Sequence, residues 1–351
     1  MNAPNALADF AETPRWLAFD LESATDRTSL LELDEDAYRA ASFLDQRAIQ
    51  PGAQLAEATW NEVAAALPAG ARRDVQYIFH IGNVGSTLIS RLLGELPAVF
   101  ALREPLLLRV FAAMLDPGGG AAARWDEPQA QARLDTLQAL LSRTFRPEQR
   151  AIVKATSFTS EIAARLVPAG SRALFLYASA QAYIENILAG PNSRQTLELL
   201  SPARLDRLRR RCPGLALDLR TLPEARKAAL GWACEMSSLN DNAARLPAEC
   251  VQWLDFDVFL ADPVGHFAAI ARHFGHQVDG ATARAIAEGP LMRRYSKALE
   301  YEFTPRTRQE ILAEARRFQG PAIRDALVWL NALAARYPAV ADAIRRSQQR
   351  G

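Results

Sequence analysis

The stretch Tyr77–Leu96 constrains the fold more than any other part of the chain. It opens with the apolar run Tyr77–Phe79, which predicts a short strand buried on both faces. The run breaks at the turn Gly82–Gly85, and the chain then continues with leucines at helical spacing, at positions 88, 92, 93 and 96. A strand, a tight glycine turn and a helix in direct succession predict one unit of an α/β fold.

The turn itself has the chemistry of an anion site. Backbone N–H groups at the start of a helix point outward, and the hydroxyls of Ser86 and Thr87 add further donors. Gly85 lacks a Cβ that would block the approach of phosphate oxygens. The turn carries no lysine, so it does not match the G-x-x-x-x-G-K-[ST] pattern. These residues alone fit phosphate binding and an ordinary strand–turn–helix connection equally well.

Four more apolar runs predict further strands, at residues 99–103, 151–153, 173–177 and 251–254, each followed by a helical segment. This alternation predicts an α/β fold with a mostly parallel sheet flanked by helices. We expect three parts. Residues 1–70 form a helical or irregular extension packed on the core, with helices at Asp34–Phe43 and Glu57–Leu67. Residues 71–310 form the α/β domain, with helical insertions at about 106–148 and 190–246, and residues 311–351 form C-terminal helices.

Composition excludes several classes of function. Basic and acidic residues nearly balance at a net charge of +1, so nothing predicts a nucleic-acid or membrane-surface partner. No apolar run reaches the roughly 20 residues that span a bilayer, and the first residues lack the pattern of a signal peptide. The three cysteines have no zinc-like spacing. We expect a cytoplasmic protein without a metal.

Three segments together resemble a known family, the bacterial PAPS-dependent sulfotransferases (PAPS is 3′-phosphoadenosine 5′-phosphosulfate). FHIGNVGSTLISRLLGEL followed by LREP resembles the family's 5′-phosphosulfate loop and second strand. WLDFDVFLADPVGHFAAIARHFG is similar to a late strand with its acidic turn and helix, and MRRYSKALEYEFTPRTR to the basic loop over the nucleotide. The segments cover about residues 75–310. The resemblance implies a P-loop-type fold and transfer of a sulfuryl group from PAPS to a hydroxyl or amine.

The resemblance implies roles for individual residues. Gly85, Ser86 and Thr87 would bind the 5′-phosphosulfate, and Asn83 stands where related loops carry a lysine. Arg91 would either replace that cation or be a solvated helix residue.

Two residues at predicted strand ends match the family's catalytic positions. Glu104 would accept the proton of the acceptor, and Lys154 would stabilise the charge on the transferring group. The alternatives are a carboxylate that complements a helix N-terminus for Glu104, and a surface salt bridge for Lys154. His80, inside the first strand of the stretch, is expected to be a satisfied core histidine.

The site for the 3′-phosphate departs from the family. Relatives carry Arg-Asp-Pro after the fourth strand and then a serine, whereas this chain has Ala178-Ser179-Ala180 and Asn186. The cations expected to hold the nucleotide instead are Arg194, Arg293, Arg294 and Lys297. The aspartates Asp255 and Asp257 are expected to cap a helix and not to bind a metal.

Three functions remain open at this stage. The first is a PAPS-dependent sulfotransferase acting on a small molecule, glycan or peptide. The second is a non-catalytic protein of the same fold that binds a ligand or partner in the same cleft, which the missing arginine favours. The third is a P-loop enzyme that transfers a phosphoryl group, against which the missing lysine counts. A homodimer through the C-terminal helices is compatible with the sequence.

Overall fold

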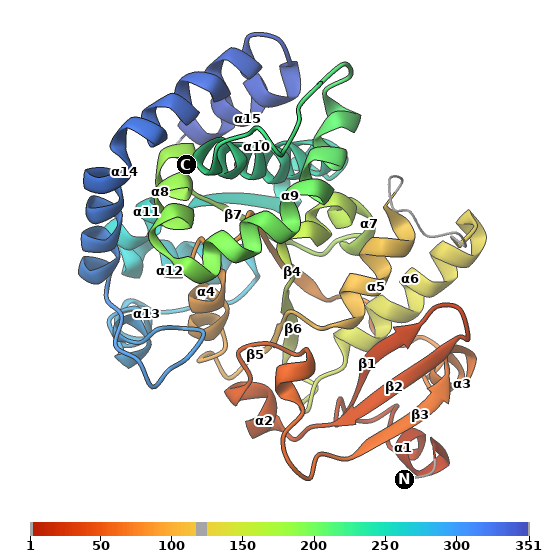
Figure 1. Cartoon of the computed structure of the whole chain (residues 1–351). Coiled ribbons are helices and arrows are strands. Elements are labelled where there is room, and N and C mark those ends of the chain that lie inside the picture. The colour runs from red at the N-terminus through yellow and green to blue at the C-terminus, as the bar shows by residue number, and fades with distance from the viewer. Residues whose placement is uncertain (1–2, 117–124, 350–351) are drawn as a thin grey trace.

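The computed structural model describes residues 3–116 and 125–349. Its centre is a five-stranded parallel sheet (Figure 1) in the order β5-β6-β4-β7-β8. The strands are β4 (Gln76–His80), β5 (Val99–Arg103), β6 (Arg150–Lys154), β7 (Ala173–Tyr177) and β8 (Val251–Asp255). All five predicted strands are present, and the α/β class is confirmed. Because the strands are parallel, the residues that follow them gather at one edge of the sheet.

Helices on both sides bury this sheet. α4 (Ser86–Leu93) packs on β4, β5 and β6, while α10 (Glu224–Ala243) contacts β4 and lies among four other helices. Those helices are α8 (Ala180–Ala189), α9 (Pro191–Arg211), α14 (Pro305–Ala334) and α15 (Pro338–Gln348). The middle residues of the strands are mostly apolar because both faces of the sheet are covered, and the polar residues stand mainly at the strand ends.

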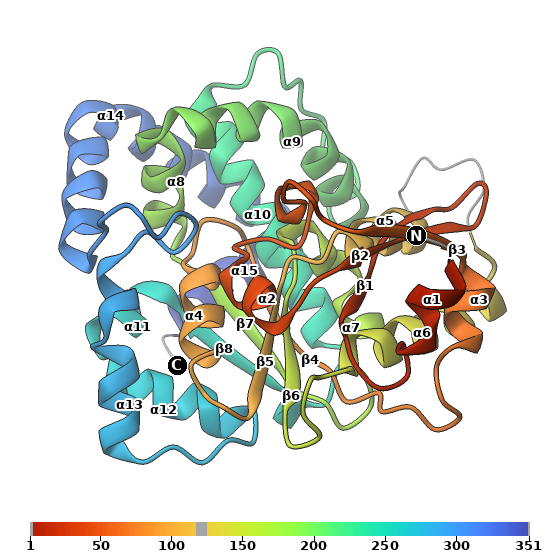
Figure 2. The same ribbon diagram turned by 90° about the horizontal axis from the view of Figure 1, so that it is seen from below.

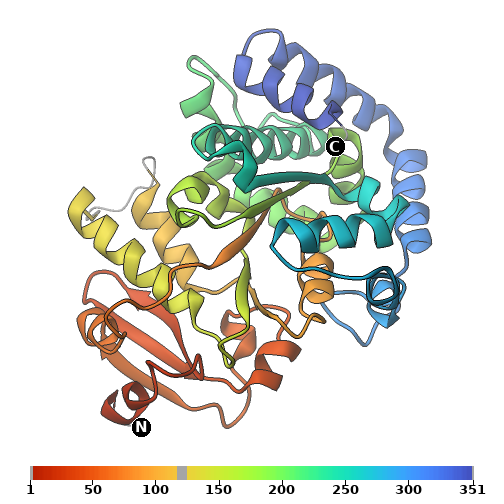
Figure 3. The same ribbon diagram turned by 180° about the vertical axis from the view of Figure 1, so that it is seen from behind.

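The N-terminal part differs from the predicted helical or irregular extension. It contains a three-stranded antiparallel sheet with the strands β1 (Trp16–Glu22), β2 (Arg27–Glu32) and β3 (Leu55–Thr59). Three short helices accompany it, α1 (Ala3–Ala8), α2 (Glu35–Ala40) and α3 (Trp60–Ala65). Figure 3 shows this sheet at the opposite end of the molecule from α14 and α15.

The predicted helix at Glu57–Leu67 is wrong in its first part for a physical reason. Leu55–Thr59 is composed largely of helix-compatible residues, but it pairs with β2 and buries every second side chain. The helix begins only at Trp60, where Thr59 and Glu62 form a reciprocal capping box. Pairing with a neighbouring strand therefore overrides local propensity here.

The remaining helices connect or follow the strands of the parallel sheet. α5 (Leu107–Leu115) and α6 (Glu127–Ser142) lie between β5 and β6, and α9 and α10 lie between β7 and β8. α11 (Phe256–Ala261), α12 (Pro263–His273) and α13 (Gly280–Ala287) follow β8, and the short α7 (Ala163–Leu166) follows β6. The division into three parts itself stays a prediction. Within residues 3–116 and 125–349, no helix has the length and apolar character to span a bilayer.

Candidate functional site

The turn between β4 and α4 has an unusual backbone. Gly82, Asn83 and Gly85 all adopt left-handed conformations, with φ of 87°, 53° and 68°. A Cβ on Gly85 would lie 2.0 Å from the ring of Phe256, so only glycine fits at this point. Left-handed residues close together in a tight turn are the backbone pattern from which anion-binding nests are built.

The amides of this loop have no partners in the protein. Within the part of the chain that the structure describes, no backbone N–H from residue 83 to residue 88 donates a hydrogen bond to a protein group. The Thr87 hydroxyl is likewise buried without a partner among those residues. Unpaired amides at a helix N-terminus attract an anion through both their hydrogen bonds and the helix dipole.

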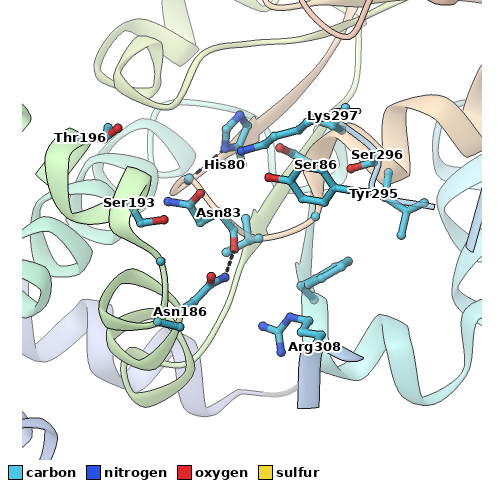
Figure 4. A pocket seen from close by; sticks show the side chains of 18 of the residues that line it. His80, Asn83, Ser86, Asn186, Ser193, Thr196, Tyr295, Ser296, Lys297 and Arg308 are labelled. Carbon is cyan, nitrogen blue, oxygen red and sulfur yellow. Dashed lines mark hydrogen bonds between the residues drawn. The ribbon is translucent and has the colours of Figure 1, made fainter. Parts of the chain in front are cut away.

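Asn186 fixes the shape of the loop from a neighbouring helix. Its side-chain amide nitrogen donates a hydrogen bond of 2.8 Å to the Asn83 carbonyl oxygen (Figure 4). This bond braces the left-handed conformation of Asn83, which costs energy for a residue with a Cβ. Asn186 comes from α8, so the loop is held by the element that follows the adjacent strand β7.

Glu104 and Lys154 form a buried ion pair at two strand ends. Glu104 directly follows β5 with a left-handed φ of 51°, and its backbone N–H donates to the Lys154 carbonyl at 2.7 Å. The Lys154 ammonium contacts one Glu104 carboxylate oxygen, and the Thr156 hydroxyl donates to the other at 3.4 Å. The Lys154 residue is only 1% exposed and Glu104 8%. A surface salt bridge is therefore excluded for Lys154.

Opposing effects set the charges of this pair. Burial alone would raise the pKa of Glu104, but the ammonium of Lys154 holds that pKa below its ordinary value. Burial lowers the pKa of Lys154 to about 8, against the attraction of Glu104. At neutral pH the pair is therefore a carboxylate and an ammonium.

His80 is more than a core residue. It ends β4, its Nδ1 accepts a hydrogen bond of 3.0 Å from the Gly82 N–H, and its ring lines the pocket. Burial and the charge of Lys154 lower the pKa of His80 to about 3, so the ring is neutral. Because Nδ1 accepts, the proton lies on Nε2. A hydrogen bond with the backbone of Ala155 acts against the lowering of the pKa. His80 is buried, as predicted for a core histidine, and its ring also borders the pocket.

One pocket of about 880 Å³ brings most of the predicted residues together. The predicted site residues that line it are Asn83, Gly85, Ser86, Thr87, Glu104, Lys154, Arg194, Arg294 and Lys297. The pocket lining does not include Arg293. Arg194 does line the pocket, but its guanidinium already has partners in the protein. It donates to the Leu188 carbonyl at 2.7 Å and faces Glu224 at 3.7 Å. Its charge is therefore already engaged within the protein.

Two arginines anchor the N-terminal part beside this pocket, where α2 lies next to β5 (Figure 2). Arg103 donates to the carbonyls of Tyr38 and Ala41, both at 2.6 Å, and Arg91 donates to the Ser42 hydroxyl and the Ser296 carbonyl, both at 2.8 Å. Arg91 is thus buried and structural, which contradicts the prediction of a solvated residue as well as that of a loop cation.

This anchoring brings residues to the pocket that sequence reasoning missed. The Arg47 guanidinium stacks over the Phe43 ring at 3.5 Å, and the Lys154 ammonium lies 5.3 Å from the centre of the same ring. Arg47 also pairs with Asp45 at 2.5 Å. No spacing in the sequence relates these residues to the loop, because only the tertiary contacts of Arg91 and Arg103 bring them there.

Of the two aspartates at the end of β8, Asp255 caps the next helix as predicted, whereas Asp257 pairs with Arg308. The Asp255 carboxylate accepts from the Asp257 N–H at 2.8 Å and caps α11. Within residues 3–116 and 125–349, no group of three or more histidine, cysteine, aspartate or glutamate side chains could hold a metal ion.

Comparison with known proteins finds similarity in structure alone. No family model and no curated protein sequence matches the chain. The sulfotransferase domain from the curacin biosynthetic pathway is similar, with 12% identity, a TM-score of 0.40, and coverage of 65% of this chain and 82% of that domain. The sulfotransferase from Alicyclobacillus acidocaldarius has 16% identity, a TM-score of 0.34, and coverage of 72% and 96%.

Sulfotransferase STF9 from Mycobacterium avium has 16% identity, a TM-score of 0.37, and coverage of 74% of this chain and 79% of that one. All three structures are sulfotransferases, the family that the three sequence segments resemble. Identities and scores at this level describe a likeness in chain path and leave the activity to be inferred from the pocket itself.

Proposed function

We propose that this protein transfers a sulfuryl group from PAPS to a hydroxyl or amine of a small-molecule, glycan or peptide acceptor. The observation that carries the proposal is the row of unpaired amides at residues 83–88 in the same pocket as the Glu104–Lys154 pair. The first feature suits an oxyanion, and the second offers a base and a cation to a reacting group. A cytoplasmic site of action and a homodimer belong to the same proposal and rest on the sequence.

The loop residues fit the 5′-phosphosulfate. The amides around Gly85 and the hydroxyls of Ser86 and Thr87 would donate to its oxygens, and the buried Thr87 hydroxyl would gain the partner it lacks. PAPS supplies a sulfuryl group whose bond to the phosphate oxygen breaks as the acceptor oxygen or nitrogen bonds to sulfur. The protein chiefly has to position the reactants and stabilise the negative charge that develops.

Lys154 and Glu104 would have separate roles in the transfer step. The Lys154 ammonium would stabilise charge on the oxygen that leaves with the phosphate, and Glu104 would take the acceptor's proton. An anion bound beside Lys154 gives that ammonium a second partner and weakens its hold on Glu104. The pKa of Glu104 would then rise toward its ordinary value, which makes the carboxylate a better base.

A second function, a non-catalytic binding protein, is favoured by one specific observation. Glu104 is already engaged by Lys154 and Thr156, and a carboxylate held in this way at a low pKa is a poor base. Turnover of PAPS distinguishes the two functions. An enzyme would form adenosine 3′,5′-bisphosphate from PAPS as wild type, and Glu104→Gln would bind ligand as before but lose this turnover. A binding protein would form none even as wild type.

Calorimetric titration with adenosine 3′,5′-bisphosphate tests the proposal. We expect binding in a buffer with EDTA, and an affinity roughly 10-fold to 100-fold lower for Thr87→Val, since a hydrogen bond to a charged group contributes about 1.5–3 kcal/mol. Ser90→Ala is the matched control, because Ser90 is also a buried, unpartnered hydroxyl of α4 but does not line the pocket. Absence of binding by the wild type at millimolar ligand would contradict the proposal.

A further inference from the structure

Arg308 is a buried arginine at the end of the segment MRRYSKALEYEFTPRTR, where the sequence alone did not distinguish it from the other arginines. It lies in the first turn of α14 and is 6% exposed, yet it lines the same pocket as the loop. Figure 4 shows its guanidinium on the Asn186 side of the loop, away from His80 and Lys297. The pocket therefore has cationic groups on both sides of the anion-binding turn.

Its contacts orient the side chain and leave one nitrogen free. One terminal nitrogen pairs with an Asp257 carboxylate oxygen at 2.7 Å, and the guanidinium lies 5.4 Å from the centre of the Phe256 ring. The other terminal nitrogen, Nη2, is buried and has no hydrogen-bond partner in the described part of the chain. Phe256 is also the ring that touches Gly85, so a single aromatic ring separates Arg308 from the loop.

A buried guanidinium nitrogen without a hydrogen-bond acceptor is a candidate donor to a bound ligand. Buried polar groups nearly always have partners, and an unsatisfied one is costly. The planar guanidinium presents its donors in a fixed fork, so Asp257 can hold one arm while the other binds an incoming phosphate oxygen.

The neighbouring charges do not oppose an anion here. Asp257 is paired with Arg308 itself, and Glu185 is paired with Arg316 at 3.2 Å. These two carboxylates are thus each matched by a guanidinium, and Glu314, which also lines the pocket, is exposed to solvent. Of the arginines predicted to hold the nucleotide, Arg194 is engaged by a carbonyl and a carboxylate.

We infer that Arg308 forms a second anion-binding point in the pocket and binds the 3′-phosphate of a nucleoside 3′,5′-bisphosphate whose 5′-phosphate lies in the loop. The inference rests on the proposed function and adds to it the residue that replaces the arginine missing after β7. A ligand with one phosphate uses only the loop, whereas a ligand with two uses both points. Arg308 therefore sets the preference for a bisphosphate.

Calorimetry with two nucleotides tests this assignment. The wild type is titrated with adenosine 3′,5′-bisphosphate and with adenosine 5′-monophosphate, and we expect the bisphosphate to bind at least 10-fold more tightly. Arg308→Met should remove most of this preference by weakening bisphosphate binding and leaving monophosphate binding unchanged. Arg306→Met is the matched control, because Arg306 lies in the same turn of α14 but is exposed and outside the pocket lining, and it should change neither affinity.

The outcomes separate this inference from the proposed function. Failure of the wild type to bind the bisphosphate overturns both. Bisphosphate binding with the same preference in Arg308→Met as in the wild type overturns the role of Arg308 alone. Should Arg308→Met not fold, Arg308→Lys decides, because a lysine keeps the charge but not the fork: a reduced preference supports the assignment, and an unchanged one contradicts it.

Discussion

The buried Glu104–Lys154 pair gives a prediction that does not depend on any ligand. Lys154→Met leaves the Glu104 carboxylate buried without its cation, which costs about 3–5 kcal/mol of unfolding free energy in comparable sites. Glu104→Gln leaves Lys154 without the attraction that supports its charge, so the pKa of Lys154 falls below about 8 and the side chain can shed its proton. This second loss is smaller because a neutral amine is less costly to bury.

The double variant shows whether the two charges act as a pair. With both charges removed, we expect most of the stability to return, since similar replacements of buried pairs are often neutral. The coupling free energy should be about 2–4 kcal/mol in urea denaturation at pH 7. The exposed pair Arg226–Asp325, at 2.7 Å, is the matched control, and its coupling should be much weaker because solvent screens both charges. The reasoning would be refuted if the losses of unfolding free energy in the two single variants added up to the loss in the double variant within about 0.5 kcal/mol.

Three further predictions concern the loop and its support. The pKa of His80 is about 3 in the folded state and about 6.5 in the unfolded chain, so the unfolded chain binds the proton first as the pH falls. The unfolding free energy should therefore fall by up to about 5 kcal/mol between pH 6.5 and pH 3. Denaturation of His80→Asn across this range should show a shallower slope, and an equal slope would contradict the assignment. The Gly85→Ala variant places a Cβ against the Phe256 ring at a residue with φ of 68°, so its unfolding free energy should fall by about 2–4 kcal/mol in thermal unfolding. Adding Phe256→Ala should recover part of this loss. Full stability of the single variant would contradict the close packing of Gly85 and Phe256. Asn186→Ala should lose about 1 kcal/mol and several-fold affinity for adenosine 3′,5′-bisphosphate by calorimetry, and unchanged affinity would mean that the loop keeps its shape unaided.

The parallel sheet and the loop were predictable because their signals are local. Apolar runs such as Tyr77–Phe79 identify strands buried on both faces, and glycines mark the turn whatever the rest of the chain does. The positions of Glu104 and Lys154 at strand ends followed from the same pattern. That they form a buried pair did not, because it depends on β5 and β6 being neighbours in the sheet.

The rest of the pocket depends on contacts between distant parts of the chain. Phe43 and Arg47 reach the site only because Arg91 and Arg103 bind the backbone around α2. Arg308 looks in sequence like one of many solvated helix arginines, and only the packing of α14 over Phe256 buries it.

The measurement that tests the central claim most directly is an amide-resolved NMR titration with adenosine 3′,5′-bisphosphate. The claim is that the unpaired N–H groups between Asn83 and Leu88 bind an oxyanion. We predict saturable changes in the amide shifts of Val84, Gly85, Ser86 and Thr87, with EDTA present. Saturable binding that leaves these amides unchanged, or no binding at all, would contradict the account.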